Sequence, residues 1–246
     1  MNRRLLVWIA LVAGCFMAAG LLWLDRPLAQ WLRASGLEQA PVFARGLGAL
    51  DVVAGIHVWL WLAGWSAFAI GCVGFALRRD DRWPRVFIAA WLVQLATLAT
   101  MIAGKQYFGR LRPRQVLESG DWSLLWFVGG GSFPSGHAAF YFGLLLPLAA
   151  ACPMRRLRAV LIAIPVYVAL ARVDLAHHFL SDVAASALIA AVYAWLIATL
   201  AGRRLPRPAS AGADRAWPPR IQAAAEPVAT APVDVASAHA RPRRMR

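Results

Sequence analysis

Three short polar segments interrupt the apolar stretches of this sequence, and they contain cations of the kinds that bind phosphate. Lys105 and Arg112 lie in the first segment and Arg172 lies in the third. During phosphoryl transfer, negative charge spreads over three equatorial oxygens, so positioned cations and N–H donors are the main catalytic resource. Arginine presents a planar fork of donors, whereas lysine acts as a mobile point charge. We therefore predict that these three residues bind a phosphate group.

The second segment, residues 133–137, is predicted to add backbone donors. Pro134 suits the first position of a helix, which would leave the N–H groups of Ser135, Gly136 and His137 without intrahelical acceptors. Such N–H groups and the helix dipole favour a bound anion. Gly136 lets a ligand approach the backbone closely, and the Ser135 hydroxyl is one more donor. We therefore assign Ser135 and Gly136 to phosphate binding.

Two histidines and one carboxylate supply the groups needed for covalent catalysis. A neutral imidazole can attack phosphorus when a partner fixes its tautomer. Asp182 follows His178 by four residues, so both lie on one face if the last helix begins early enough. His137, on another helix, can protonate the leaving oxygen and later activate water. One histidine then attacks, and the other shuttles protons.

Other polar residues near these segments have competing interpretations. A metal site could be built from four of them, namely His177, His178, Asp174 and Asp182. The three cations in the same pocket would repel a divalent metal, so we expect neither a metal nor another cofactor. His177 is interpreted as a bystander, because adjacent helical residues point about 100° apart. For Arg110 and Arg114, contact with lipid headgroups and contact with the substrate stay as two alternatives.

The composition places this chemistry in a membrane protein. Hydrophobic residues make up 60% of 246 positions, charged residues only 15%, and the mean hydropathy is +0.56, which is too apolar for an ordinary soluble domain. Spans of hydrocarbon need about 20 apolar residues and must be helices or closed barrels. Six apolar segments approach this length, at residues 5–24, 52–77, 86–104, 136–152, 159–175 and 183–201. We predict an all-α polytopic membrane bundle of six transmembrane helices within residues 1–202.

Basic residues in the connecting loops predict the orientation of these spans. With six crossings the basic clusters all lie on one side, which the positive-inside rule makes the cytoplasm. The clusters are Arg3 and Arg4; Arg78, Arg79, Arg82 and Arg85; Arg155, Arg156 and Arg158; and Arg203, Arg204 and Arg207. Both termini are then cytoplasmic, and in a bacterium residues 25–51, 105–135 and 172–182 face the periplasm. The net charge of +14 is explained by this topology, so no nucleic-acid partner is expected.

Three further segments have their own interpretations. Cys15 follows Val12-Ala13-Gly14 as in a lipoprotein signal, but the apolar sequence continues through Leu24, which favours an uncleaved span. Residues 25–51 mix apolar side chains with charges, which predicts a helix lying on the membrane surface. Residues 203–246 are rich in Arg, Pro and Ala without apolar periodicity. We expect them to form a disordered basic cytoplasmic tail.

The three polar segments together resemble the type 2 phosphatidic acid phosphatase (PAP2) superfamily of membrane lipid phosphatases. Residues 105–113 read K-x6-R-P, residues 134–137 read P-S-G-H, and residues 172–182 read R-x5-H-x3-D. The stretch that carries the resemblance covers about residues 86–200. The resemblance implies a six-span core, a phosphohistidine intermediate and independence from metal. Ala171 departs from the family pattern, which often has serine before the arginine.

Carried over by position, the resemblance assigns a role to each site residue. His178 is the nucleophile, Asp182 its orienting partner and His137 the general acid and base. The phosphate-binding set is Lys105, Arg112, Ser135, Gly136 and Arg172.

The expected function is hydrolysis of phosphate from a lipid at the periplasmic face of the inner membrane. Candidate substrates are undecaprenyl diphosphate, lipid A phosphates, phosphatidylglycerophosphate and phosphatidate, with a slight preference for the first. A lipid phosphotransferase would use the same residues and differ only in the acceptor. Anion transport is less favoured, because the charges lie at one face and not at mid-membrane. The predicted spans exclude the soluble haloperoxidases of this superfamily.

Overall fold

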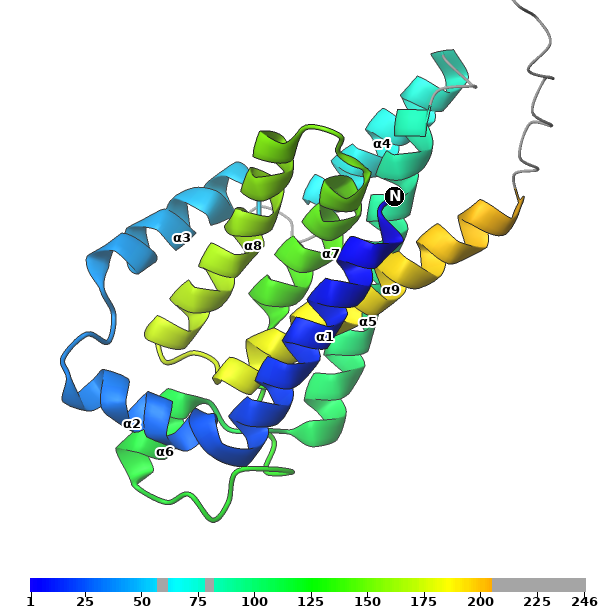
Figure 1. Cartoon of the computed structure of the whole chain (residues 1–246). Helices are drawn as coiled ribbons and strands as arrows, with labels where there is room; N and C mark the ends of the chain where they lie inside the picture. Colours follow the sequence, from blue (N-terminus) through cyan, green and yellow to red (C-terminus); the bar gives the residue numbers. More distant parts are fainter. Residues whose placement is uncertain (57–61, 78–81, 205–246) are drawn as a thin grey trace, which may run out of the picture. The chain divides into compact units, whose positions relative to one another are not determined.

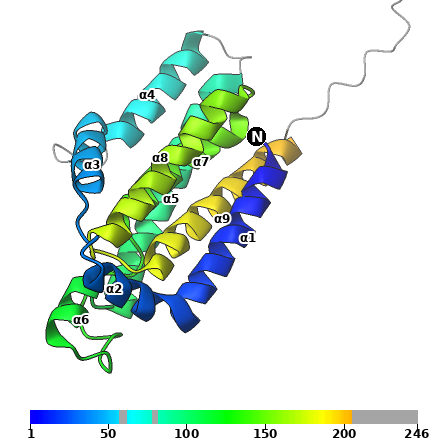
Figure 2. The ribbon, with the colours of Figure 1, turned by 60° about the vertical axis from the view of Figure 1, so that its left-hand side comes forward.

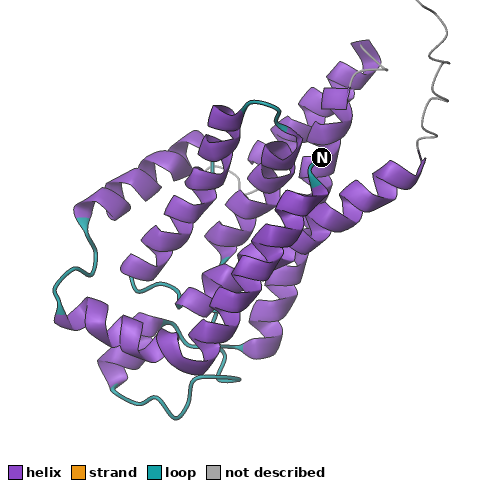
Figure 3. Cartoon of the chain, in the orientation of Figure 1, coloured by secondary structure: helices purple, strands orange, loops and turns teal. Residues whose placement is uncertain are grey.

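The computed structural model describes residues 1–56, 62–77 and 82–204, and these form helices joined by turns with no strand (Figures 1 and 3). The predicted all-α class is therefore confirmed. The elements in chain order are α1 (Arg3–Ala19), a π-helical turn η1 (Gly20–Leu24), α2 (Asp25–Ala34), α3 (Pro41–Val53), α4 (Leu62–Leu77), α5 (Arg82–Phe108), α6 (Pro113–Ser119), α7 (Gly136–Ala151), α8 (Arg155–Asp174) and α9 (Leu180–Arg204).

Helix α7 packs against α5, α8 and α9, while α1 packs along α9 and α4 along α5 (Figures 1 and 2). Small residues allow these close contacts, as expected for helices packing in a membrane. Four alanines of α9 belong to one buried cluster: Ala187, Ala190, Ala191 and Ala194. On α7, a Cβ added at Gly143 would lie 2.9 Å from the Cα of Gln94 on α5. The Ala-rich helix α9 thus supplies small side chains where the helices pack most closely.

The number of membrane spans is only partly supported. Three helical stretches among the described residues are long and apolar enough to cross a membrane: Arg3–Ser35, Arg82–Ser119 and Leu180–Ala201. Helices α4 and α7 are apolar but shorter, at 16 residues each. Helix α8 has 20 residues and begins with several arginines. The bundle of six spans therefore stays a prediction.

Two predicted boundaries differ from the structure. The second apolar segment does not begin a helix at residue 52, because α3 ends at Val53 and the chain turns at Gly55, whose φ of 68° suits glycine. Apolar composition alone could not separate the end of α3 from α4. The last helix continues through Arg204, and the rest of the predicted tail, residues 205–246, lies outside the described residues.

One end of the helical bundle gathers the three polar segments. Helices α2 and α6 lie at this end in both ribbon views, beside the last turns of α5 and α8 and the first turn of α9 (Figures 1 and 2). Residues 25–51, for which a surface helix was predicted, contain α2 and most of α3. The loop of residues 109–135 contains the short helix α6. The fold thus brings together residues that are more than 70 positions apart in the sequence.

Candidate active site

His178 lies in the turn between α8 and α9, and its ring is held by the loop before α7. Its backbone N–H donates to the Arg172 carbonyl at 3.1 Å. Its Nδ1 lies 2.7 Å from the Ser132 carbonyl oxygen and 3.6 Å from Asp182 Oδ2. A carbonyl can only accept, so Nδ1 carries the proton and Nε2 keeps the lone pair. The nearest orienting partner is therefore Ser132, with the predicted partner Asp182 just behind it.

The Asp182 carboxylate is fully buried and receives three close hydrogen bonds. The Ser132 hydroxyl donates to Oδ2 at 2.5 Å, and the Phe179 N–H donates to the same oxygen at 2.8 Å. Arg110 Nη1 donates to Oδ1 at 2.6 Å. Ser132 therefore touches both members of the predicted His178–Asp182 pair, one through its hydroxyl and the other through its carbonyl.

Arg110 pairs with two buried carboxylates, a role that neither of the alternatives offered for it includes. Its side chain is buried, with its guanidinium carbon 4.4 Å from the ring centre of Trp126 and 4.1 Å from that of Phe179. Besides Asp182, it donates to Asp25 Oδ2 on α2 at 2.8 Å. The guanidinium thus joins the first helical stretch of the chain to the carboxylate of the site. Arg114 is exposed, and its two alternatives stay open.

The residues predicted to bind phosphate converge beside His178. Lys105, Arg112 and Arg172 lie close enough to interact electrostatically with one another, and Lys105 Nζ donates to the carbonyl of Gly131. Arg172 Nε and Ser135 Oγ are buried and have no hydrogen-bond partner within the described part of the chain. Buried donors normally have partners. Mutually repelling cations and unpaired donors are together suited to a ligand with several anionic oxygens.

The start of α7 differs from the prediction at one position. Gly136 is the first helical residue and Ser135 is the N-cap, so Pro134 lies before the helix. The Ser135 N–H is not free, because it donates to the Asp182 carbonyl at 3.1 Å. The N–H groups of Gly136 and His137 open the helix and have no intrahelical acceptor. Two backbone donors, and not three, are therefore available to an anion here.

His137 has a carboxylate partner that the sequence analysis did not identify. Its Nε2 lies 3.1 Å from Oδ2 of Asp51, which is on α3. The Tyr141 hydroxyl, one turn further along α7, donates to the other oxygen of Asp51 at 3.1 Å. The His137 side chain is 27% exposed, whereas that of His178 is 2% exposed. The two histidines therefore occupy different environments.

Residues 85–206 match the family model described as the PAP2 superfamily. The protein belongs to the PAP2 superfamily. It is 29% identical to a lipid A 1-phosphatase of Rhizobium johnstonii over 186 residues, covering 68% of this chain and 72% of the relative. It is also 29% identical to a lipid A 1-phosphatase of Rhizobium etli over 204 residues, covering 72% of this chain and 81% of the relative. No solved structure matches. The family and these relatives make the chain a phosphatase.

The electrostatics of this PAP2 phosphatase keep His178 neutral. Burial lowers the pKa of His178 to about 4, and the nearby Arg172 and Lys105 act in the same direction, against Asp182. At neutral pH the ring is therefore uncharged, as a nucleophile requires. Burial and Arg172 lower the pKa of His177 to about 3. His177 lines a different pocket from His178, together with Arg33, Glu38 and Arg114.

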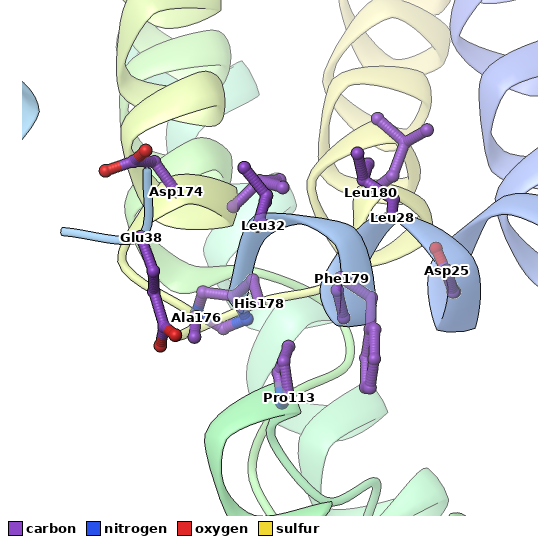
Figure 4. Close-up of a pocket in the computed structure, with 12 residues that line it drawn as sticks. Asp25, Leu28, Leu32, Glu38, Pro113, Asp174, Ala176, His178, Phe179 and Leu180 are labelled. Atoms are coloured by element: carbon purple, nitrogen blue, oxygen red, sulfur yellow. The ribbon is translucent and has the colours of Figure 1, made fainter. Parts of the chain in front are cut away.

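The pocket that reaches His178 is narrow, with a volume of about 10 Å³. Figure 4 shows Leu28 and Leu32 of α2 on one side of it and His178 and Phe179 on the other. Asp174 also lines this pocket. Among the described residues, no group of three or more His, Cys, Asp or Glu side chains is placed to hold a metal ion. The four residues of the metal alternative are thus not brought together.

The position of Arg110 predicts that replacing it with lysine lowers kcat while KM changes little. Lysine keeps the charge but loses the fork that joins Asp182 to Asp25. Loss of an outer partner that orients a metal-binding histidine costs about 10–100-fold in activity, and we expect a loss of similar size here. Steady-state kinetics of phosphate release measures the effect, and the matched control is Arg155→Lys, an exposed arginine at the start of α8 and far from the site. Equal kinetics for the two variants would show that Arg110 only fills space.

The pKa of His178 predicts an unusual titration. Because burial disfavours the imidazolium, the ring takes up a proton only near pH 4, whereas an unperturbed histidine titrates near 6.5. Histidine ¹⁵N chemical shifts in detergent micelles report the protonation state, and the spectrum of His178→Gln assigns the signal. We expect a neutral ring from pH 8 to about pH 5. A midpoint near 6.5 would contradict the buried geometry.

Proposed function

We propose that this protein is a membrane lipid phosphatase that acts at the periplasmic face through a phosphohistidine intermediate. One observation carries the proposal: a buried, neutral His178 with a free Nε2 lies beside clustered cations and unpaired buried donors. A nucleophile and a phosphate site are then present in one place. The geometry does not require a metal to generate the nucleophile, because the imidazole already has its lone pair.

The reaction has two steps in this arrangement. The Nε2 of His178 attacks phosphorus, the bond from phosphorus to the lipid oxygen breaks, and His137 gives a proton to that oxygen. Water then attacks phosphorus, His137 takes a proton from the water, the bond between phosphorus and Nε2 of His178 breaks, and inorganic phosphate leaves. The cations Lys105, Arg112 and Arg172 hold the equatorial oxygens in both steps. Ser132 and Asp182 keep the ring of His178 in one orientation.

An apolar groove supports a lipid as the substrate. It has a volume of about 420 Å³ and is lined by side chains of α1, α7, α8 and α9. Val173 and Leu180 line both this groove and the pocket that contains His178. The apolar groove therefore ends close to the turn that carries His178. The names of the two Rhizobium relatives favour a lipid A phosphate over undecaprenyl diphosphate.

The distribution of charge along α8 supports a periplasmic site. The helix begins at Arg155 beside Arg156 and Arg158, and it ends next to the site at Asp174. A helix of 20 residues is about 30 Å long, which is the thickness of the hydrocarbon core. The basic turn and the site therefore lie at opposite ends of a membrane-length helix. Since basic turns stay in the cytoplasm, the site faces the other side.

A substrate panel tests the proposed activity. We expect the purified protein to release phosphate from lipid A faster than from undecaprenyl diphosphate, phosphatidate or phosphatidylglycerophosphate, and to do so in excess EDTA. His178→Ala should lower release by about 10³-fold or more, because the covalent route is lost. ³²P-labelled lipid should leave an acid-labile label on the wild type but not on this variant.

Three outcomes of these experiments would contradict the proposal. Undiminished phosphate release by His178→Ala would overturn the nucleophile assignment. Loss of activity in EDTA with recovery on adding a metal would overturn the phosphohistidine route. Label that appears in a second lipid, without free phosphate, would make the protein a phosphotransferase.

Thiol labelling tests the orientation. After Cys15, Cys72 and Cys152 are replaced, a cysteine at Ser119, on the exposed end of α6, should react with a membrane-impermeant maleimide in intact spheroplasts. A cysteine at Met154, which is 59% exposed in the turn between α7 and α8, should react only after lysis. The opposite pattern would place the site in the cytoplasm.

A further inference from the structure

Asp51 is a buried carboxylate that lies outside the stretch matched by the family, residues 85–206. It is 4% exposed and sits in the last turn of α3. Its two oxygens have separate partners, His137 Nε2 at 3.1 Å and the Tyr141 hydroxyl at 3.1 Å. It also attracts the guanidinium of Arg172 electrostatically. One carboxylate thus contacts the predicted acid and attracts one predicted phosphate-binding cation.

We propose that Asp51 is a positioning residue that orients His137 for proton transfer to the leaving lipid oxygen. The proposal rests on the phosphatase activity proposed above. An ionised carboxylate only accepts hydrogen bonds, so Nε2 of His137 carries the proton in this contact. Nδ1 is then the nitrogen that exchanges a proton with the substrate. A carboxylate that fixes the tautomer and angle of a catalytic histidine is a known catalytic device.

The proton balance follows from this tautomer. In the first step Nδ1–H of His137 gives its proton to the lipid oxygen as the phosphorus–oxygen bond breaks, and the ring becomes neutral. In the second step the lone pair on Nδ1 takes a proton from water as the oxygen attacks the phosphohistidine. The Nε2–H bond to Asp51 persists through both steps. Asp51 itself neither gains nor loses a proton.

A purely structural role for Asp51 would be to hold α3 against the bundle. The chain contains a matched example of such a role in Asp174 on α8. Its Oδ2 accepts a hydrogen bond from the backbone N–H of Ala40, just before α3, at 2.9 Å. Asp174 thus fixes the start of α3, and within the described residues no hydrogen bond or ion pair joins its carboxylate to His137 or His178. If Asp51 only held α3 in place, as Asp174 does, replacing Asp51 would have the same effect on the protein as replacing Asp174.

The test compares two leaving groups in the first step. With enzyme in excess, we measure the single-turnover release of the alcohol from a short-chain phosphatidate and of nitrophenol from p-nitrophenyl phosphate. A lipid alcohol needs a proton to leave, whereas nitrophenolate leaves readily without one. Asp51→Asn should therefore slow alcohol release by about 10–100-fold and nitrophenol release by only a few-fold. His137→Ala should show the same pattern more strongly.

The controls separate this role from folding and from the proposed function. Asp174→Asn should affect both substrates equally, in line with any loss of thermal stability. If Asp51→Asn fails to fold, Tyr141→Phe, which keeps the carboxylate and removes one of its partners, should show a weaker version of the same leaving-group pattern. Equal slowing of both substrates by Asp51→Asn, or by Tyr141→Phe in its place, would overturn the proposal while leaving the phosphatase intact. If the wild type releases no phosphate from any lipid, the proposed function itself fails.

Discussion

The structure of the candidate active site depends on how the negative charge of the buried Asp182 carboxylate is neutralised. An ionised carboxylate away from water is costly unless it is paired and hydrogen-bonded. Arg110 supplies the charge, and Ser132 and the N–H of Phe179 supply the remaining donors. Arg110 is itself buried, so it needs more than one partner, and Asp25 provides the second carboxylate. The aromatic faces of Trp126 and Phe179 cover the guanidinium. Because Arg110 pairs with both Asp25 and Asp182, it links the first helical stretch of the chain to the site.

The same burial sets the chemistry of His178, the proposed nucleophile. A ring that is 2% exposed loses hydration of its charged form, so His178 stays neutral even with a carboxylate 3.6 Å away. A closer ion pair would favour the imidazolium and remove the lone pair. The Ser132 carbonyl, at 2.7 Å, orients the ring without adding a charge. Orientation and nucleophilicity are thus provided by different neighbours, which explains why the serine lies between histidine and aspartate.

The sequence predicted a set of candidate catalytic and phosphate-binding residues but not the residues that hold them. The spacing of charged residues in the polar segments predicted His178, His137, Asp182 and the cations as candidates, because few other arrangements of those types suit one reaction. The residues that hold them act through contacts between segments far apart in the chain, and the local spacing of residues cannot predict such contacts. These residues are Arg110, Asp25, Asp51 and Ser132. Asp25 did offer a signal, since it is a carboxylate placed directly after 20 largely apolar residues. The end of α3 was missed because apolar residues continue across the turn at Gly55.

In the proposed mechanism, the two histidines have different roles in a single site. His178 is enclosed, donates from Nδ1 to an uncharged carbonyl, and keeps Nε2 for phosphorus. His137 is partly exposed, contacts the carboxylate of Asp51 directly through Nε2, and keeps Nδ1 for the substrate. A nucleophile must hold its lone pair, whereas an acid must carry a proton and release it to a group that arrives from outside. Burial beside a neutral acceptor serves the first need, and exposure beside a carboxylate serves the second. The environments differ in the direction that the division of labour requires.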